Sequence, residues 1–489
     1  MVQTRDDRAG IMSDSRSLHL DLTRDGWTVV DPAHPPPLAD TDLTFSPDRS
    51  EVTIERPWLS HRAVFVRQRA GSVHLSTEWE SLLCDGPAAL DLGYAKDYLR
   101  FQAPLTRRTF AGGIRYLGHG ERIRFQRGGC LTESLSRPVS SLPRSAIVQR
   151  LEALLPEGDD VCFHLSSGLD SSLLVLLARR LGRPVKAATI RTRGRGASDE
   201  LETVERLADE AGIDLTVFDL KDFDPWQEGQ RLIDRSLAYP IAHPSHLVRY
   251  LLDRSISESG LGRRVVTGRG PDEALAGYDA HRDEFSPSFR HLARVTCTSE
   301  AQIAALFADG PDGDAQTNHG RLAAGGALSL ERRLEYDLGA LFEAWNIVES
   351  RLGPGLGLEY VHPFLDRQVM AALLALPAGD KLADGAQKVF LRRELGYLYP
   401  DYVLTRPKLG LTIDIREYLR DETVDGILAR IWEPSPFATD FLKPGGCRQL
   451  VEDTLGGRAN HGWQIWSLYL CALAYRKLDA KRGRDVRTS

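Results

Sequence analysis

The sequence is poor in cysteine, and its cysteines follow no disulfide or metal-binding spacing. Six cysteines are spread over 489 residues without a Cys-x-x-Cys pair, and the first is Cys84. This usage argues against a disulfide framework and favours the reducing cytoplasm as the location. No histidine has the spacing of a metal ligand. His164, inside an apolar run, is expected to be a core residue whose polar atoms are satisfied within the protein.

Long apolar runs and an excess of basic charge are also missing. No segment reaches the length of a transmembrane helix, and the N-terminus lacks the apolar stretch of a signal peptide. The formal net charge is −6 with both signs interspersed, which provides no argument for a nucleic-acid partner. We therefore expect a cytoplasmic protein with no membrane and no nucleic-acid partner. A chain of 489 residues is long enough for two or three domains.

The pattern of apolar residues divides the chain into an N-terminal part with β-strand periodicity and a later part in which strands alternate with helices. Residues 17 to about 133 contain short alternating apolar runs that are typical of β-strands. Residues 134–143 contain two prolines and four serines and form the expected linker. From residue 145, apolar strands alternate with helices, which predicts an α/β fold with a doubly wound parallel sheet and a site at the carboxyl ends of its strands. After about residue 285 the pattern is mainly helical.

One loop has the composition of a phosphate site. Residues 161–172 read VCFHLSSGLDSS and join a buried strand to the start of a helix. Small side chains, hydroxyl groups and the positive end of the helix dipole gather at Ser166, Ser167, Gly168 and Ser171. Asp170 would repel a bare phosphate, so its presence indicates Mg²⁺ between them. Taken alone, the string fits an ordinary strand–turn–helix corner equally well.

Further motifs distinguish these readings. The loop lacks the Gly-Lys-Ser/Thr ending of the kinase-type P-loop. It resembles the Ser-Gly-Gly-x-Asp-Ser loop of the ATP pyrophosphatases, except that Ser167 replaces the second glycine and restricts positive φ there. Residues 265–278 read VVTGRGPDEALAGY, residues 359–366 read EYVHPFLD, and residues 388–410 begin with Lys388 and end in RPKLG. In this order, between about residues 145 and 475, the four motifs resemble the synthetase domain of asparagine synthetase, the β-lactam synthetases and the lasso-peptide cyclases.

The resemblance implies an enzyme that adenylates a substrate carboxylate with ATP, releases pyrophosphate and lets an amine displace AMP. ATP and Mg²⁺ are the implied cofactors, with Asp170 and Asp272 as metal ligands. Lys388 is expected to contact pyrophosphate, and Lys408 to stabilise the transition state of amide formation. Besides the loop, the implied nucleotide-binding residues are Thr267 and Gly268, beside the ribose and acyl group, and Ile190, against the adenine. Turn-capping aspartates and solvated lysines would show the same residue types.

Residue 269 departs from the family pattern. Arg269 stands where asparagine synthetases have Glu and β-lactam synthetases have Tyr. Because a guanidinium cannot accept a proton, Arg269 is not the general base. We expect it either to clamp a substrate carboxylate or to pair with Asp272 or Glu273. By resemblance to the β-lactam synthetases, Glu349 is the candidate base.

The N-terminal part departs as well. Glutamine-using members begin with Met-Cys, and that cysteine hydrolyses glutamine, whereas this sequence opens Met-Val-Gln-Thr. Residues 76–83 (STEWESLL) and 109–114 (TFAGGI) still resemble the later part of the glutaminase domain. Cys84 follows in an apolar stretch and is expected in the core. The resemblance thus implies a degenerate, inactive glutaminase-like domain of the Ntn-hydrolase type at residues 1–140 and an amide synthetase domain at residues 141–489.

We interpret the protein as an AMP-forming amide ligase or cyclase of antibiotic or other natural-product biosynthesis, making a lactam, a macrolactam or an intermolecular amide. Its partner would be a small molecule or peptide with a carboxylate and an amine, and a homodimer is left open. One alternative is an ammonia-dependent enzyme like asparagine synthetase. Another, suggested by Ser167 and Arg269, is a non-catalytic pseudo-synthetase that binds nucleotide. A tRNA-modifying ATP pyrophosphatase would call for catalytic cysteines or a basic face, and the sequence shows neither.

Overall fold

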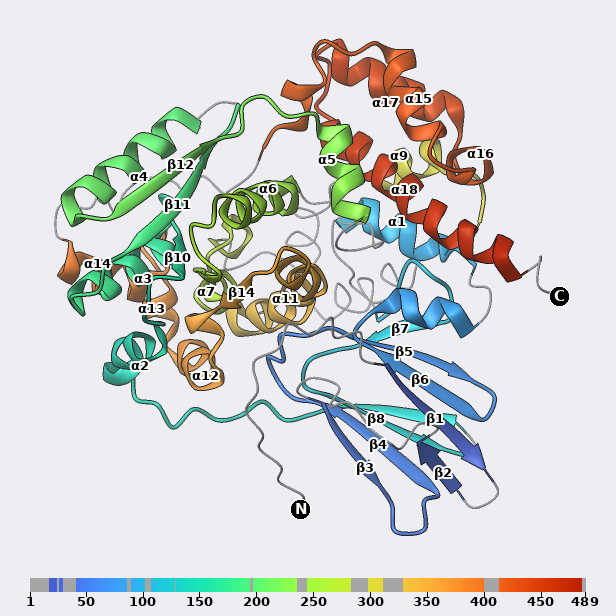
Figure 1. The fold of residues 1–489 in the computed structure, drawn as a ribbon, viewed down its shortest axis with the longest axis horizontal. Helices are drawn as coiled ribbons and strands as arrows, with labels where there is room; N and C mark the ends of the chain where they lie inside the picture. Colours follow the sequence, from blue (N-terminus) through green and yellow to red (C-terminus); the bar gives the residue numbers. More distant parts are fainter. Residues whose placement is uncertain are drawn as a thin grey trace.

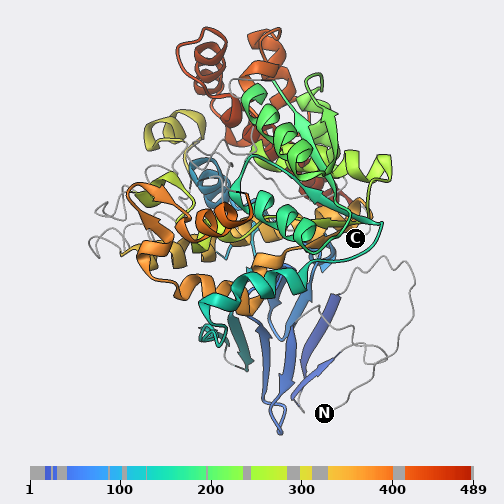
Figure 2. The same cartoon turned by 90° about the vertical axis from the view of Figure 1, so that its left-hand side faces the viewer.

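The chain contains a strand-rich N-terminal part, a parallel sheet between helices and a helical C-terminal part (Figure 1). Figure 2 shows the N-terminal strands extending away from the rest of the molecule. The computed structural model describes residues 17–23, 26–29, 41–85, 89–101, 107–127, 129–193, 197–234, 244–282, 298–310, 329–399 and 413–485.

The N-terminal part consists of two antiparallel sheets, in the strand orders β2-β1-β6-β5-β7 and β3-β4-β8-β9. The first contains β1 (Ser17–Thr23), β2 (Gly26–Val29), β5 (Val64–Arg69), β6 (Ser72–Ser76) and β7 (Ile114–Leu117). The second contains β3 (Asp42–Phe45), β4 (Glu51–Arg56), β8 (Glu121–Gln126) and β9 (Gly129–Ser134). Between β6 and β7 lie the 3-10 helix η1 (Trp79–Asp85) and α1 (Leu92–Phe101). The strands expected over residues 17 to about 133 are therefore present.

The alternating pattern of β4 explains how these sheets pack. Val52 and Ile54 are buried, and their partners across the ladder are Phe125 and Ile123 of β8. Both pairs belong to one core cluster with Val66 and other buried residues of the first sheet. Side chains of period two thus fill the space between the two sheets, as in other stacked antiparallel sheets. The third inward position of β4 is Arg56, a charged residue considered below.

The predicted parallel sheet is confirmed. It has five strands in the order β12-β11-β10-β13-β14, and every neighbouring pair is parallel. The strands are β10 (Val161–His164), β11 (Lys186–Arg191), β12 (Asp214–Asp219), β13 (Arg264–Val266) and β14 (Glu359–Val361). The chain winds from β10 toward β12 in one direction and from β13 to β14 in the other. The switch point between β10 and β13 is where ligands bind in open α/β sheets.

Helices cover both faces of this sheet, and the strand residues divide between them. On one face, Phe163 and Val266 share a core cluster with residues of α3 (Leu169–Arg180) and α4 (Ala197–Ala211). On the other face, Cys162 and Val265 share a cluster with α6 (Pro244–Ser259) and α11 (Leu330–Gly355). Consecutive strand residues point to opposite faces, so short apolar strands buried on both sides produce this three-layer arrangement.

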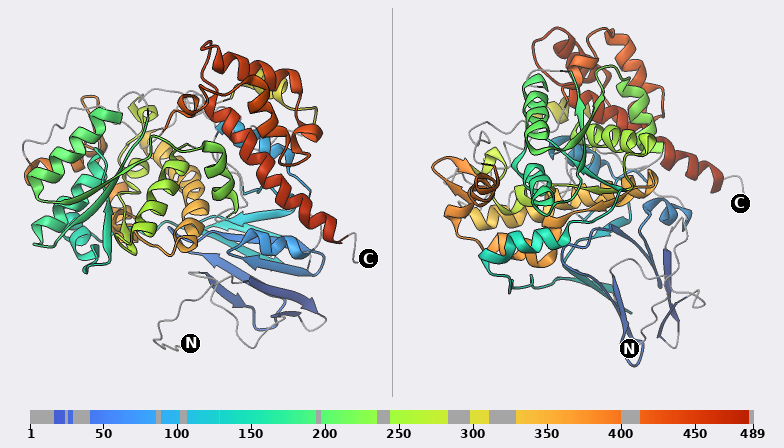
Figure 3. Two further views of the ribbon diagram at one scale, coloured as in Figure 1. Left: turned by 45° about the horizontal axis from the view of Figure 1, so that its top comes forward. Right: turned by 60° about the vertical axis from the view of Figure 1, so that its left-hand side comes forward.

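The described part of the chain after residue 285 is mainly helical, as expected, with β14 and the two-residue strands β15 (Leu382–Ala383) and β16 (Ala386–Gln387) as exceptions. Its remaining helices are α9 (Glu300–Leu306), α12 (Arg367–Ala375), α13 (Ala378–Lys381), α14 (Val389–Leu398), α15 (Val424–Trp432), α16 (Phe437–Phe441), α17 (Pro444–Leu455) and α18 (Gly462–Asp485). Earlier in the chain lie α2 (Ile147–Leu154), α5 (Pro225–Leu232) and α7 (Pro271–Ala274). Figure 3 shows α18 beside α1, and the two helices are in contact. In the described part of the chain, every helix is too short or too polar to cross a membrane.

Candidate functional site

The loop between β10 and α3 is closed by hydrogen bonds among its own serines. The Gly168 N–H, at the N-cap of α3, donates to Ser166 Oγ over 3.2 Å. The Ser166 N–H donates to Ser171 Oγ over 3.2 Å, and the two hydroxyl oxygens lie 3.0 Å apart. The first-turn N–H groups of α3 lack partners within the helix and converge on this loop. The loop therefore has the geometry of an anion site at a helix N-terminus.

The serine that replaces the family glycine fits the loop without backbone strain. Ser167 is not among the described non-glycine residues with positive φ, and Gly168 itself has φ −72°. The substitution therefore does not argue against nucleotide binding. Ser167 Oγ donates to Glu200 Oε1 over 3.4 Å, and burial raises the pKa of this carboxyl to about 7. Glu200 lies near the start of α4, and the sequence analysis did not identify it.

The two predicted metal ligands meet at one ammonium group. Lys388 Nζ lies 2.5 Å from Asp170 Oδ2 and 2.7 Å from Asp272 Oδ1. Burial acts to lower the pKa of Lys388, but the two carboxylates outweigh it and hold that pKa above its ordinary value. Asp170 is in the first turn of α3 and Asp272 in the first turn of α7. The structure thus brings together three residues that the motifs assigned to one pyrophosphate and metal site.

Two glycines, Gly268 and Gly277, allow Asp170, Asp272 and Lys388 to lie this close together. A Cβ on Gly277 would lie 1.9 Å from Asp272 Oδ1 and 2.5 Å from Lys388 Cε. A Cβ on Gly268 would lie 2.8 Å from the Ser171 nitrogen and 2.9 Å from Asp170 Cβ. No real Cβ makes contacts this short, so both positions require glycine. Gly268 follows β13, and the carboxyl end of this strand therefore lies against the N-terminus of α3.

The residues fit a nucleotide with Mg²⁺. Among the described residues, no three His, Cys, Asp or Glu side chains are grouped to hold a metal on their own. Mg²⁺ commonly takes one or two carboxylates and completes its shell with phosphate oxygens and water. Asp170 and Asp272, beside a helix N-terminus, are such a donor set. Ile190, at the end of β11, is buried in the core cluster on the α6 side, and its adenine contact stays a prediction.

The expected partners of Arg269 are corrected by the structure. Arg269 Nη1 donates to Glu349 Oε2 over 2.5 Å, and Nη2 donates to the Phe342 carbonyl over 2.7 Å. Its guanidinium also lies 4.6 Å from the centre of the Phe342 ring. The ion pair is thus formed with Glu349 rather than with Asp272 or Glu273. Sequence analysis missed this pair because the two residues are 80 positions apart.

The environment of Glu349 argues against its role as the general base. Its carboxylate lies 3.3 Å from Arg249 Nη1 and 3.3 Å from His362 Nε2, in addition to Arg269. Burial would raise the pKa of Glu349, but these cationic and hydrogen-bonding neighbours lower it to about 2. Such a weakly basic carboxylate is a fixed anion that orients its neighbours.

His362 occupies a central position that the sequence analysis did not identify. Its Nδ1 lies 2.7 Å from Thr267 Oγ1, and its Nε2 faces Glu349. The signal was available in the strand register: Val266 of β13 pairs with Val361 of β14, so the next residues, Thr267 and His362, lie side by side. Sequence analysis would have identified His362 if it had considered every polar residue that directly follows a buried strand.

His164 is a core residue, as expected. Its Nε2 lies 2.8 Å from Asp253 Oδ1, and the Asp253 carboxylate also accepts from Arg249 Nε over 2.7 Å and from the Tyr360 hydroxyl over 2.5 Å. Burial lowers the pKa of His164, so the imidazole is neutral at pH 7. This pair and the Glu349 group share Arg249, which makes one buried polar network behind the carboxyl ends of the strands.

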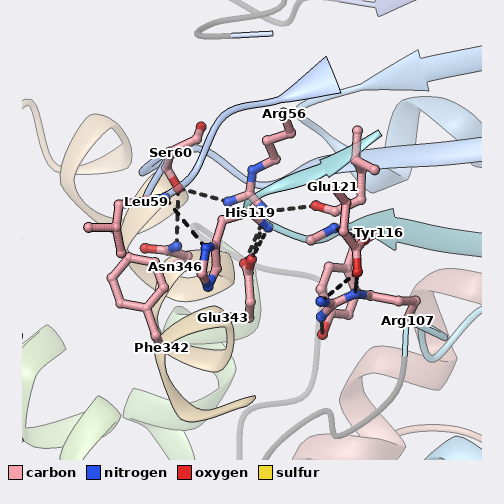
Figure 4. Close-up of polar contacts among 12 residues, drawn as sticks. Arg56, Leu59, Ser60, Arg107, Tyr116, His119, Glu121, Phe342, Glu343 and Asn346 are labelled. Carbon is pink, nitrogen blue, oxygen red and sulfur yellow. Dashed lines mark hydrogen bonds and ion pairs between the residues drawn. The ribbon is translucent and has the colours of Figure 1, made fainter. Parts of the chain in front are cut away.

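Helix α11, which bears Glu349, is held by the N-terminal sheets. Figure 4 shows Glu343 between Arg56 and His119. Arg56 Nη1 lies 3.0 Å from Glu343 Oε1, both side chains are 0% exposed, and the backbone N–H of His119 donates to Glu343 over 2.5 Å. One turn along, Asn346 Nδ2 donates to the Ser60 carbonyl over 3.2 Å. The strand-rich part therefore fixes the helix that positions Arg269 and Glu349.

Two predicted residues cannot be compared with the structure. Lys408 falls within residues 400–412, which lie outside the described part of the chain. Cys84 belongs to η1, but its side chain is not among those described. Their expected roles stay predictions.

Comparison with known proteins supplies the family. Residues 144–476 match the family model of asparagine synthase. The chain is 21% identical over 456 residues to "Asparagine synthetase [glutamine-hydrolyzing] 1" of Bacillus subtilis, covering 81% of this chain and 71% of that protein. It is 23% identical over 352 residues to a "Putative asparagine synthetase [glutamine-hydrolyzing]" of Mycobacterium tuberculosis, covering 63% and 53%. It is 32% identical over 274 residues to "Carboxyethyl-arginine beta-lactam-synthase" of Streptomyces clavuligerus, covering 55% and 43%.

Proposed function

The chain belongs to the asparagine synthase family, and on this premise we propose that it forms an amide bond in two steps. A substrate carboxylate first attacks the α-phosphorus of ATP and expels pyrophosphate. An amine then attacks the acyl-adenylate and displaces AMP. The observation that supports this reaction best is the meeting of Asp170, Asp272 and Lys388 at the N-terminus of α3. The Lys388 ammonium would complement the negative charge of a departing pyrophosphate, and the two carboxylates would complement the positive charge of a metal bound to it.

Each proposed role follows from the chemistry of the side chain. The N–H groups and hydroxyls around Ser166 and Ser171 would bind the pyrophosphate oxygens, and Lys388 would balance their charge. Mg²⁺, held by Asp170 and Asp272, would neutralise charge that develops on the leaving group. Lys408 would stabilise the oxyanion of the second step or the phosphate of departing AMP.

We further propose that the nitrogen donor is not glutamine. The printed sequence has no cysteine before Cys84, so no counterpart of the glutaminase nucleophile is present in it. The two stacked sheets of residues 17–134 support a degenerate glutaminase-like domain of the Ntn-hydrolase type at residues 1–140. Residues 141–489 would form the synthetase domain. The amine is then free ammonia or a group on the substrate.

For the substrate, we propose a small molecule or peptide of natural-product biosynthesis that carries both the carboxylate and the amine. The identity of 32% with a protein named for β-lactam synthesis supports this class. A lactam, a macrolactam and an intermolecular amide would all use the same two steps. Asparagine formation from ammonia is the competing reaction, supported by the relatives named as asparagine synthetases.

One experiment tests the reaction type. The full-length protein is incubated with ATP, Mg²⁺ and two probe sets, carboxyethyl-arginine alone and L-aspartate with ammonium chloride, and the nucleotide products are separated. We expect AMP and pyrophosphate with one of these sets or with a peptide from a further panel. ADP and phosphate as stoichiometric products would contradict the proposal. ATP binding without turnover on any probe would indicate a pseudo-synthetase instead.

A further inference from the structure

The proposed amide-forming step requires a group that removes a proton from the attacking amine, and the obvious candidates do not qualify. Arg269 carries a guanidinium, which has donors only and cannot accept a proton. Glu349 lies close to two guanidinium groups, of Arg269 and Arg249, and to His362. A carboxylate bound in this way is stabilised in its charged form and has little affinity for a proton. The base must therefore be sought among the neutral groups of the same network.

Two neutral groups, of Thr267 and His362, and the Glu349 carboxylate form a continuous line from the end of β13 into the core. Thr267 Oγ1 lies 2.7 Å from His362 Nδ1, and His362 Nε2 lies 3.3 Å from Glu349 Oε2. An ionised carboxylate can only accept a hydrogen bond, so this contact is favourable for a neutral imidazole when Nε2 carries the proton. His362 Nδ1 is then the acceptor, and the Thr267 hydroxyl donates to it. Hydroxyl, imidazole and carboxylate thus stand in the order used to activate a hydroxyl oxygen in other enzymes.

The hydroxyl end of this line is next to the nucleotide site. Thr267 precedes Gly268, whose Cα packs so closely on Ser171 and Asp170 that a Cβ would lie within 3 Å of both. The strand register places Thr267 and His362 together at the carboxyl ends of β13 and β14, beside the switch point of the sheet. Thr267 is thus the member of the line that is nearest in the chain to the nucleotide loop.

We propose that Thr267, backed by His362 and Glu349, takes the proton from the attacking amine, an inference that rests on the proposed amide synthesis. As the amine nitrogen bonds to the acyl carbon, one N–H proton passes to Thr267 Oγ1 and the hydroxyl proton passes to His362 Nδ1. The bond from the acyl carbon to the AMP oxygen then breaks, and AMP leaves with the electron pair. The resulting imidazolium is stabilised by Glu349 until it releases its proton to solvent.

The surroundings of His362 suit this role. Four charged or titratable groups of the synthetase part face His362: Glu349 of α11, Arg249 of α6, Arg269 after β13 and Tyr360 of β14. A fifth is His61, in the connection between β4 and β5, whose ring centre lies 5.5 Å from that of His362. Burial lowers the pKa of His362 well below its usual range, an effect that the Glu349 carboxylate opposes. The imidazole is therefore neutral at pH 7, and once protonated it gives up its proton readily, so it acts as a transient relay rather than as a strong base. His61 is exposed and gives the proton a neighbouring group at the surface.

A matched pair of variants tests the proposal in the full-length protein. Thr267→Val keeps the side-chain shape without the hydroxyl, and Thr267→Ser keeps the hydroxyl. Both are assayed with the two probe sets for pyrophosphate–ATP exchange, for amide formation, and for trapping of the adenylate by hydroxylamine. Hydroxylamine is unprotonated at neutral pH and small enough to lose its N–H proton to solvent, so its attack depends less on a base in the protein. We expect Thr267→Val to lower amide formation about a hundredfold or more, a loss about tenfold or more larger than any loss of exchange or trapping. Thr267→Ser should retain most of the amide formation.

The outcomes separate this inference from the proposed function. If Thr267→Val loses exchange as severely as amide formation, Thr267 serves the nucleotide and the inference is wrong. If Thr267→Val forms amide normally, the hydroxyl has no role in proton transfer. Absence of exchange in the wild-type protein on every probe would instead contradict the proposed function itself.

A second measurement does not depend on turnover. In protein labelled with ¹⁵N-histidine, the His362 signal is identified by its loss in His362→Gln, and its nitrogen shifts report the tautomer. We expect the proton on Nε2. A proton on Nδ1 would overturn the inference, because the imidazole could not then accept from Thr267.

Discussion

At the residue scale, Asp170 and Asp272 each contact the Lys388 ammonium, at 2.5 and 2.7 Å. Either Asp→Asn substitution removes one carboxylate charge from the proposed Mg²⁺ site and from a buried cation. We expect Asp170→Asn and Asp272→Asn each to lower turnover at least a hundredfold and to weaken Mg²⁺-dependent ATP binding, measured by calorimetry. Asp160→Asn is the control, because Asp160 pairs with Arg264 beside the opposite end of β10. Normal Mg²⁺ dependence in both site variants would contradict the assignment.

The contacts of Arg269 can be tested by two substitutions at this position. Its planar fork contacts Glu349 and the Phe342 carbonyl together, which a lysine ammonium cannot reproduce. We expect Arg269→Lys to lower the melting temperature and amide formation while the KM for ATP changes little. In Arg269→Ala, one of the groups that lower the pKa of Glu349 is lost while burial still acts to raise it, so this pKa should rise from about 2. Unchanged kinetics and stability in both variants would show that the pair is dispensable.

Lys408 lies outside the described residues, and its role is predicted from the motif alone. If its charge meets the transition state of amide formation, Lys408→Ala should lower kcat about a hundredfold and leave ATP binding intact. Single-turnover assays would show adenylate accumulation. Lys443→Ala, at a half-exposed lysine after α16, provides the control. Full turnover in folded Lys408→Ala protein would rule out the assignment.

At the scale of elements, α11 is the part that joins the N-terminal sheets to the site. Its Glu343 is completely buried with Arg56, while its Phe342 and Glu349 hold Arg269. Removing one partner of a buried ion pair leaves the other charge uncompensated. We expect Glu343→Gln to lower the free energy of unfolding by about 3–5 kcal/mol, measured by denaturant titration.

The same helix offers a matched control for that prediction. Glu335 pairs with Arg137 over 3.4 Å, but both side chains are largely exposed, at 57% and 41%. Solvent screens such a pair, so Glu335→Gln should cost less than about 1 kcal/mol. Equal effects of Glu343→Gln and Glu335→Gln would mean that the contact between α11 and the N-terminal sheets contributes little.

At the scale of the whole molecule, the N-terminal sheets are expected to serve the synthetase part mechanically rather than by supplying ammonia. Glutamine should therefore give no activity above that of an equal concentration of a non-hydrolysable amide, and no glutamate should be released. Cys84→Ser should change neither result, since Cys84 is expected to be a core residue. Glutamate release at the rate of amide formation would contradict this division of roles.

The order of four motifs along the chain was enough to predict the family and a nucleotide loop, and the alternation of apolar strands with helices was enough to predict the parallel sheet, because each of these is a local pattern. Burial on both faces gives β10 and β13 continuous apolar runs, and small residues mark the turn into α3. The glycine replaced by Ser167 looked more restrictive in the sequence than it is, since neither Ser167 nor Gly168 uses positive φ.

The pairing of charges was decided only by the tertiary structure. Lys388 and Asp170 are 218 positions apart, Arg269 and Glu349 are 80 apart, and Arg56 and Glu343 are 287 apart. Local pattern indicates which residues can be charged, but an ion pair depends on distance in space and on exclusion of water. For that reason the local motifs were enough to predict the kind of chemistry at the strand ends. The packing of α11, α7 and α14 decided which side chains meet there, and it placed the Glu349 carboxylate against Arg269, Arg249 and His362.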